Sequence, residues 1–360
     1  MHEFTPGLKL SRLFFRDAVR PILDHVAPDL KYAAGLIGSG SEVLGFDDEM
    51  SSDHHWGPRV MIFLNDVEER ERLVAVLRDE LPTQFLGYST NFSEPDPNDN
   101  NVQRLVASDD GSVNHRVEFF TPREYLLAYL NFDIENDIEP VDWLTFPEQK
   151  LRSITGDTIF HDEIGLKNVL ARFAYYPHDV WLYLLASGWK RIGQEEHLMG
   201  RAGLAGDDIG SALIASRLVR DIIRLCFLME CAYAPYPKWF GTAFRQMKCE
   251  SKLTPHLEAV LRSTTWQERE SHLVPAYEVI ANMHNELGIT VTLPSTADNF
   301  FGRPFKVIEL MGGFVNAIRS QIQDGELKQL PLIGSIDQFT DSTDVLADAT
   351  KRMKIRKLYQ

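Results

Sequence analysis

The first 150 or so positions alternate between short apolar runs and longer amphipathic stretches, which predicts a mixture of strands and helices. Residues 8–27 place apolar side chains near one face of a helix, and Pro21 is expected to kink it. A second helix is predicted over 67–81. A third is predicted from Pro122, since proline suits the first helical position. The predicted strands are 31–37, 59–64, 83–88 and 116–120. This alternation is typical of an α/β or α+β domain.

From about residue 151 the apolar positions repeat with a helical period over long stretches, and strand signals are few. These stretches are 176–189, 207–233, 237–247, 266–287 and 304–323. They predict a helical bundle. We therefore expect an α/β domain over 1–150, a helical bundle over 151–330, and a C-terminal tail or terminal helix over 331–360.

The charge of the chain limits its partners. Its 360 residues include 37 basic and 52 acidic ones, for a formal net charge of −15. Binding to the backbone of bulk nucleic acid needs a basic surface that displaces counterions, so we do not expect it. A nucleotide that arrives with its own Mg²⁺ remains possible.

Cysteine content and the N-terminus point to a compartment. The three cysteines, Cys226, Cys231 and Cys249, form no disulfide framework and have no zinc spacing. The N-terminus has no apolar signal core, and no stretch approaches the roughly 18 apolar residues of a membrane span. We predict a soluble, cytoplasmic protein without membrane association; a homodimer is possible.

A turn rich in glycine and serine follows the first predicted strand, in LIGSGSE. Gly38 and Gly40 would let the backbone approach a phosphate, and Ser39 or Ser41 could add a hydroxyl donor. A helix beginning near Ser41 would direct its first N–H groups at that phosphate. The turn is therefore a candidate triphosphate site.

An acidic segment precedes the second predicted strand, which we expect to open on Asp53. Side chains alternate along a strand, so Asp53 and His55 would share one face and His54 the other. Glu118, on a neighbouring predicted strand, is the best candidate for a third ligand. Two metal ions held there could stabilise the entering and leaving oxygens of an in-line displacement.

At these residues the sequence resembles the nucleotidyltransferase superfamily, which includes DNA polymerase beta, kanamycin nucleotidyltransferase and the minimal nucleotidyltransferases. The shared pattern is Gly-Ser, a spacer and Asp-x-Asp/Glu, and it stands here as Gly40-Ser41 and Asp53-His54-His55. The stretch GSEVLGFDDEMSSDHHWGPR is similar to an uncharacterised bacterial branch, a domain of unknown function. YYPHDVW (175–181) and APYPKWFGTAF (234–244) also match that branch.

The resemblance implies a nucleotidyltransferase-type mixed sheet followed by an all-helical bundle. It implies metal-dependent transfer of a nucleoside monophosphate from an NTP, with ATP the first choice, to a small-molecule or protein hydroxyl. Gly40 and Ser41 would hold the triphosphate, while Asp53, His55 and Glu118 would hold divalent metal. Asp53 or Glu118 would deprotonate the acceptor.

One departure from the pattern is chemical. His55 stands where a second carboxylate is expected, and imidazole suits Mn²⁺ or Zn²⁺ better than Mg²⁺. The site could instead be a degraded one that binds a nucleotide or a partner protein without catalysis. Asp53 could be a turn residue, His55 a structural histidine and Glu118 a solvent-facing side chain. Pro58 also argues against a fully paired strand over 53–58. Asp47, Asp48 and Glu49 could lie at the rim of the site or could be metal ligands.

Basic residues outside the turn could also reach a phosphate. Arg59 follows His55 closely, and Lys238 lies in PYPKW. Arg217, Arg220 and Arg224 form one stripe along the predicted helix 207–233. In enzymes resembling kanamycin nucleotidyltransferase the helical domain meets the triphosphate, but such a stripe can equally be a solvated helix face.

Other chemistries find little support in the sequence. It has no GxxxxGK[ST] and no GxSxG, and Val43 stands where a dinucleotide fingerprint needs its third glycine. A minor alternative is an RNase-like helical domain with an Arg-x4–6-His motif, which Arg191 and His197 match. Arg20 and His25 match it equally.

Overall fold

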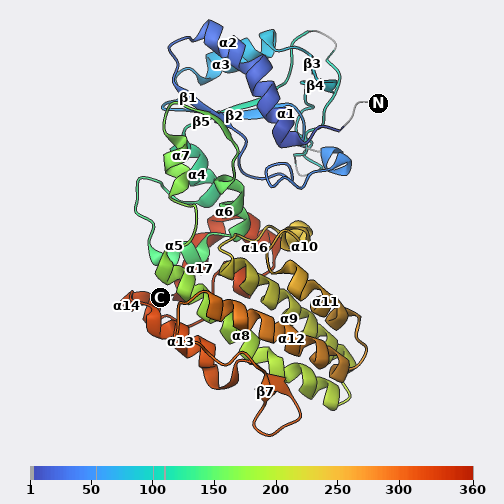
Figure 1. The fold of residues 1–360 in the computed structure, drawn as a ribbon. Coiled ribbons are helices and arrows are strands. Elements are labelled where there is room, and N and C mark those ends of the chain that lie inside the picture. Colours follow the sequence, from blue (N-terminus) through green and yellow to red (C-terminus); the bar gives the residue numbers. More distant parts are fainter. Residues whose placement is uncertain (1–3, 54, 100, 109–110, 360) are drawn as a thin grey trace. The chain divides into compact units, whose positions relative to one another are not determined.

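The structure is a computed structural model that describes residues 4–53, 55–99, 101–108 and 111–359, without the side chain of Asp53 (Figure 1). The chain divides into two compact units. The first comprises Met1–Asp137 and Lys150–Ala174, and the second Ile138–Gln149 and Tyr175–Gln360.

A four-stranded mixed sheet forms the centre of the first unit, in the order β5-β2-β1-β6. Its strands are β1 (Tyr32–Gly35), β2 (Arg59–Leu64), β5 (Arg116–Phe120) and β6 (Ile159–Asp162). β1 runs antiparallel to both β2 and β6, whereas β2 and β5 are parallel. The predicted strands 31–37, 59–64 and 116–120 are confirmed, and so is the α+β fold class.

One face of this sheet is apolar and covered by helices. α1 (Gly7–Phe14), a π-helical turn (Phe15–Val19) and α2 (Arg20–Val26) form one nearly continuous helix, as predicted for 8–27. Together with α3 (Arg70–Glu80) they pack on inward-facing residues of the sheet, such as Ile62. The π turn ends immediately before α2, whose first turn contains Pro21.

The opposite face is covered in part by α4 (Pro122–Leu130), which begins with Pro122 at its first turn as predicted and with a capping box at Thr121. Tyr125 of α4 meets Phe63 and Phe120 edge-on, at centroid distances of 5.6 and 5.4 Å. Residues paired across neighbouring strands share a face, so Arg59 and Arg116, which pair, lie on this same side.

Two features of the first unit differ from the sequence prediction. The expected strand over 83–88 is a small hairpin of β3 (Gln84–Phe85) and β4 (Tyr88–Ser89), separate from the main sheet. Residues 150–174, expected in the bundle, supply β6, which pairs with β1. The units therefore do not divide at residue 150. α6 (Glu148–Thr155) and α7 (Leu166–Ala171) flank β6.

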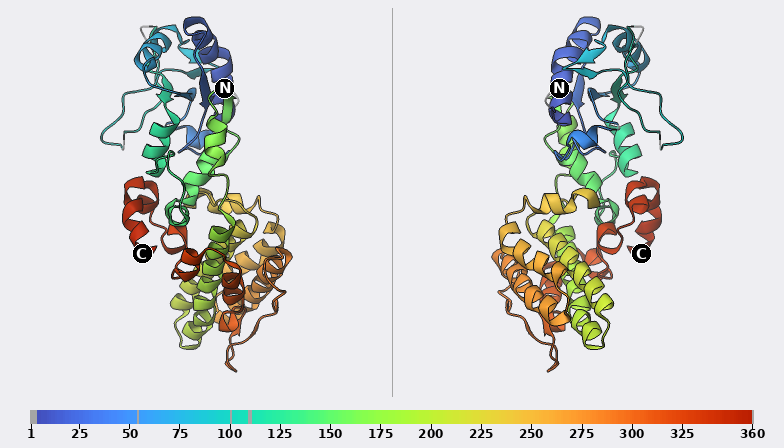
Figure 2. Two further views of the ribbon diagram at one scale, coloured as in Figure 1. Left: turned by 90° about the vertical axis from the view of Figure 1, so that its left-hand side faces the viewer. Right: turned by 90° about the vertical axis from the view of Figure 1, so that its right-hand side faces the viewer.

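The second unit is helical, as predicted. Its long helices are α8 (His178–Leu204), α9 (Asp208–Met229), α11 (Glu250–Arg262) and α12 (Trp266–Glu286). α8 and α9 lie side by side in both Figure 1 and Figure 2. Shorter pieces are α5 (Pro140–Thr145), a 3₁₀ turn (Pro237–Trp239) and α10 (Phe240–Phe244). α11 lies outside the predicted ranges and contains Pro255.

The predicted helix over 304–323 is only partly present, because α13 covers Gly313–Gln321 and β8 (Lys306–Val307) pairs with β7 (Asp298–Asn299). Beyond it are α14 (Gly325–Gln329), α15 (Ile336–Phe339), α16 (Thr343–Ala347) and α17 (Arg352–Ile355). The buried Arg352 anchors the C-terminal segment to Asp142 of α5. Within the described part of the chain, no helix is both long and apolar enough to cross a membrane.

Candidate functional site

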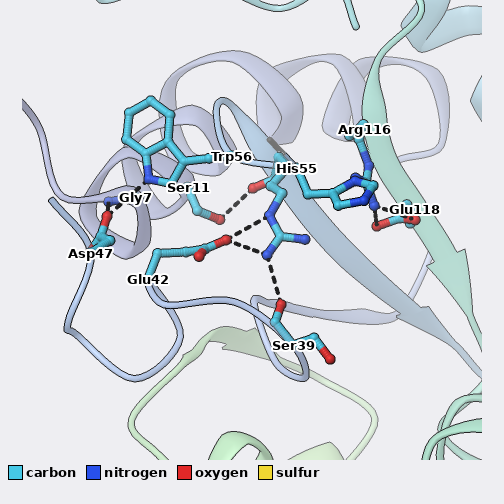
Figure 3. A network of polar contacts seen from close by, with 10 residues as sticks. Gly7, Ser11, Ser39, Glu42, Asp47, His55, Trp56, Arg116 and Glu118 are labelled. Atoms are coloured by element: carbon cyan, nitrogen blue, oxygen red, sulfur yellow. Dashed lines mark hydrogen bonds and ion pairs between the residues drawn. The ribbon is translucent and has the colours of Figure 1, made fainter. Parts of the chain in front are cut away.

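The strand directions bring three polar segments to one end of the sheet. β1 ends at Gly35, which pairs with Met61 near the start of the antiparallel β2. β5 is parallel to β2, so its first residue, Arg116, pairs with Arg59. The turn after β1, the segment before β2 and the start of β5 therefore meet at one edge. We call this the sheet-edge site (Figure 3).

The turn at Gly38–Ser41 lies in this edge and needs its glycines. Gly38 has φ +90° and Gly40 φ +144°, which other residues rarely adopt. A Cβ atom on Gly38 would lie 2.1 Å from the Tyr125 hydroxyl. The Gly38 amide donates to the Ser153 carbonyl over 3.0 Å. The expected helix near Ser41 is wrong, because residues 41–45 form hydrogen-bonded turns instead.

The side chain of Arg59, at the start of β2, holds this turn in its conformation. Its side chain is buried and donates through Nε to Glu42 Oε1 (3.1 Å), through Nη2 to the same oxygen, and through Nη2 to the Ser39 carbonyl (3.2 Å). The Ser11 hydroxyl in turn donates to the Arg59 carbonyl over 2.5 Å. Arg59 thus joins α1, β2 and the turn. Its assignment to phosphate binding stays a prediction.

The acidic loop between the turn and β2 has structural roles. Asp47 Oδ2 accepts hydrogen bonds from the Gly7 amide (2.6 Å) and from Trp56 Nε1 (3.0 Å). Asp48 accepts from the amide and hydroxyl of Ser51, at the start of a 3₁₀ helix over Glu49–Asp53. Asp47 and Asp48 are therefore engaged with the protein itself, which favours the rim interpretation over the ligand one.

The expected strand geometry of Asp53 and His55 is wrong. β2 begins only at Arg59, and Asp53 is the last residue of the 3₁₀ helix. His55 has φ +50° and its amide donates to the Gln103 carbonyl over 2.9 Å. The period-two argument therefore does not apply to this pair. His54 and the Asp53 side chain lie outside the described part of the structure, so the role of Asp53 stays a prediction.

Arg116 connects the two remaining candidate metal ligands, His55 and Glu118. Its Nη1 lies 2.9 Å from His55 Nδ1, and its Nη2 lies 3.3 Å from both carboxylate oxygens of Glu118 (Figure 3). Arginine only donates, so His55 Nδ1 is the acceptor in this contact. Arg116 was not among the site residues predicted from the sequence. The available signal was a basic residue two positions before Glu118, hence on the same strand face.

The described residues do not fit a metal as they stand. The Arg116 guanidinium donates to both His55 Nδ1 and Glu118, so a metal ion bridging them would have to displace it. Among the described side chains, no three His, Cys, Asp or Glu groups form a cluster that could hold a metal ion.

The candidate basic residues of the second unit have partners there. Arg217 and Arg220 both lie on α9. Arg217 forms an ion pair with Glu195 (2.8 Å), and Arg220 forms one with Asp341 (2.8 Å). Lys238 is exposed, with its Nζ 4.7 Å from the centroid of the Trp239 ring. Their assignment to nucleotide binding stays a prediction.

The two residues of the RNase-like motif do not share a site. Arg191 forms an ion pair with Asp221 (3.1 Å), whereas His197 stacks on Phe300 with ring centroids 4.3 Å apart. Burial lowers the pKa of His197, which keeps the imidazole neutral. These contacts give the pair two separate structural roles, and the structure offers no support for the RNase alternative.

Comparison with known families gives one match. A family described as a domain of unknown function (DUF4037) matches residues 143–240, about a quarter of the chain. The match contains the segment 175–181 and the start of 234–244, both of which the sequence analysis singled out. It does not include the glycine-serine turn or the sheet-edge site.

Comparison with characterised proteins and solved structures adds little. No curated protein matches the chain. One similar solved structure is that of a nucleotidyltransferase-like protein from Exiguobacterium sibiricum, at 10% identity over 76% of this chain and 78% of that one. Its TM-score of 0.33 is too low to carry an argument about fold or activity.

Proposed function

We propose that the first unit binds a nucleoside triphosphate, ATP above all, as its magnesium complex at the sheet-edge site. The observation that carries this proposal is the convergence of the Gly38–Ser41 turn, His55 and the Arg116–Glu118 pair on one edge of the sheet. The glycines allow close approach of the phosphates, and Ser39 and Ser41 supply hydroxyl groups. The nearby carboxylates disfavour a bare polyphosphate, which is why the nucleotide would arrive with its metal.

The same geometry argues that nucleotidyl transfer is lost or slow. Transfer by the superfamily pattern needs a second carboxylate where His55 stands. Here His55 and Glu118 are both engaged by Arg116. We therefore place a nucleotide-binding unit first and a metal-dependent nucleotidyltransferase acting on a small-molecule or protein hydroxyl second. The enzyme is favoured by one observation, the presence of Asp53 at the superfamily spacing after the glycine-serine turn.

Calorimetry with MgATP tests the site. Gly38→Ala forces a methyl group against the Tyr125 hydroxyl and should abolish binding. Gly45→Ala is the matched control, because Gly45 also has a positive φ (+71°) but nothing lies within 4 Å of an added Cβ. We expect Gly45→Ala to bind MgATP as the wild type does. Equal binding by wild type and Gly38→Ala would refute the site.

Pyrophosphate release separates the two candidate functions. Wild-type protein that binds MgATP without releasing pyrophosphate is a binding unit, and His55→Asp should then gain some release by restoring the carboxylate. Release by the wild type, lost in Asp53→Ala, would establish the enzyme instead. No heat with MgATP or MnATP would leave a protein-interaction module.

A further inference from the structure

The second unit contains a pocket of about 160 Å³ that the sheet-edge site does not use. Two arginines one helical turn apart on α9, Arg220 and Arg224, form one wall. The segment around the 3₁₀ turn adds Tyr236 and Phe240, and α16 adds Leu346. All of its lining residues belong to the second unit.

Both arginines have hydrogen-bond donors left over. Arg224 Nε and Nη1, and Arg220 Nε, are buried and have no hydrogen-bond partner among the described residues. Arg224 Nη1 lies 3.9 Å from Glu148, too far for a hydrogen bond, and its guanidinium lies 5.4 Å from the centroid of the Phe240 ring. Buried donors without acceptors are costly, so a small shift of either side chain that brings one of these donors to a ligand oxygen in the pocket would be stabilised.

The rest of the lining is mainly apolar and aromatic. Tyr236, Phe240 and Leu346 stand beside two prolines, Pro235 and Pro237. At roughly 30 Å³ for each water in the liquid, the volume corresponds to about five water molecules. That space suits one ring with a small substituent.

The charged residues around the pocket limit the charge that a ligand substituent can carry. Asp341 and Asp337 also line the pocket, and Arg220 Nη1 already donates to Asp341 over 2.8 Å. Glu148 lies behind Arg224, and its Oε2 accepts from the Ala234 amide. Burial raises the pKa of Asp337, which favours its neutral form, although Arg224 opposes this shift. Together with Asp221, whose Oδ1 lies 3.7 Å from Arg220 Nε, these carboxylates at least match the charge of the two arginines, so a second negative charge on the ligand is strongly disfavoured.

We propose that this pocket binds a small monocyclic aromatic carboxylate. The carboxylate accepts hydrogen bonds from Arg224 and Arg220, and the ring lies against Tyr236 and Phe240. Guanidinium groups suit carboxylates because they offer parallel donors. This proposal goes beyond nucleotide binding and does not depend on it.

Calorimetry on the full chain tests the proposal with benzoate, benzamide and phenyl phosphate at millimolar concentrations. Benzoate should bind, and benzamide, its neutral counterpart, should bind at least about tenfold more weakly. No heat with benzoate overturns the proposal. Benzamide binding equal to that of benzoate, or tighter binding of phenyl phosphate, also overturns the assignment of a singly charged ligand.

Two variants test whether the ligand binds in this pocket. Arg224→Lys keeps the charge but removes the fork of donors, and should weaken benzoate binding by about tenfold. Arg245→Lys is the matched control on an exposed arginine outside the pocket, and should bind as the wild type does. Leu346→Phe fills the pocket while leaving both arginines, and should abolish binding even if Arg224→Lys does not fold. Unchanged benzoate binding in either pocket variant refutes the location.

Discussion

Two arginine–glutamate pairs at the sheet-edge site differ in burial and in what they do. In the Arg59–Glu42 pair the side chains are 8% and 6% exposed, and Arg59 also binds the Ser39 carbonyl. In the Arg116–Glu118 pair they are 14% and 36% exposed, and Arg116 also binds His55. The first pair fixes the shape of the glycine-serine turn. The second lies closer to solvent and holds His55 and Glu118 together.

The largest expected effect comes from breaking the buried pair. Glu42→Ala leaves the Arg59 guanidinium buried without its carboxylate and should lower the free energy of unfolding by roughly 3–5 kcal/mol. The matched change Glu118→Ala, at a partly exposed pair, should lower it by about 1 kcal/mol or less. Urea denaturation of both variants measures the difference. Equal losses would show that burial does not distinguish the pairs.

A smaller effect on stability, but a gain in metal binding, is expected from Arg116→Gln. Removing the guanidinium should cost about 1 kcal/mol or less. It frees His55 Nδ1 and Glu118, a nitrogen and oxygen pair that suits Mn²⁺. Calorimetry with Mn²⁺ should show binding in this variant and little in the wild type. Arg104→Gln, which breaks the exposed pair with Asp99 (2.7 Å), is the control and should gain no binding. Equal Mn²⁺ binding in wild type and Arg116→Gln would show that Arg116 does not exclude metal.

The smallest effect is a pH dependence next to Arg116. His115 Nε2 lies 3.1 Å from the Val74 carbonyl, and Nδ1 accepts from the Val117 amide, so the neutral ring secures the start of β5. Burial lowers the pKa of His115 below its usual value of about 6.5. The unfolded chain therefore binds this proton more readily, and the contribution of His115 to stability is lost as the pH falls below about 6.5.

Urea denaturation at pH 7.5 and at pH 5.5 checks this sign. The wild type should lose more stability on acidification than His115→Gln does, because glutamine does not titrate. An equal loss of unfolding free energy in both proteins would show that protonation of His115 does not cause the pH dependence.

Patterns of nearby residues predicted much of the fold. The strands 59–64 and 116–120, the start of α4 at Pro122 and the helical character of the second unit follow from periodicity and capping, which act over a few residues. β6 was missed because its strand is short and finds its place by pairing with β1, more than a hundred positions earlier in the chain. The hairpin of β3 and β4 was mistaken for a sheet strand for a related reason, since pairing decides which sheet a strand joins.

The candidate site was predicted in part. The glycines of the turn were singled out because they would let the backbone approach a phosphate, and in the structure both adopt a positive φ. The strand geometry assumed for Asp53 and His55 was wrong, because β2 begins at Arg59 and the preceding segment folds as a 3₁₀ helix and turns.

The sequence by itself determined most kinds of element, the glycine-serine turn and the presence of His55 at a position where the superfamily pattern would predict a carboxylate. Only the tertiary structure decided that Arg59 supports the turn and that Arg116 joins His55 to Glu118. The reason is physical. Helix period and turn conformation depend on neighbouring residues, whereas the partner of a charged side chain depends on which strands pair and in which direction. That pairing brings Arg116 to His55 across 61 positions of the chain.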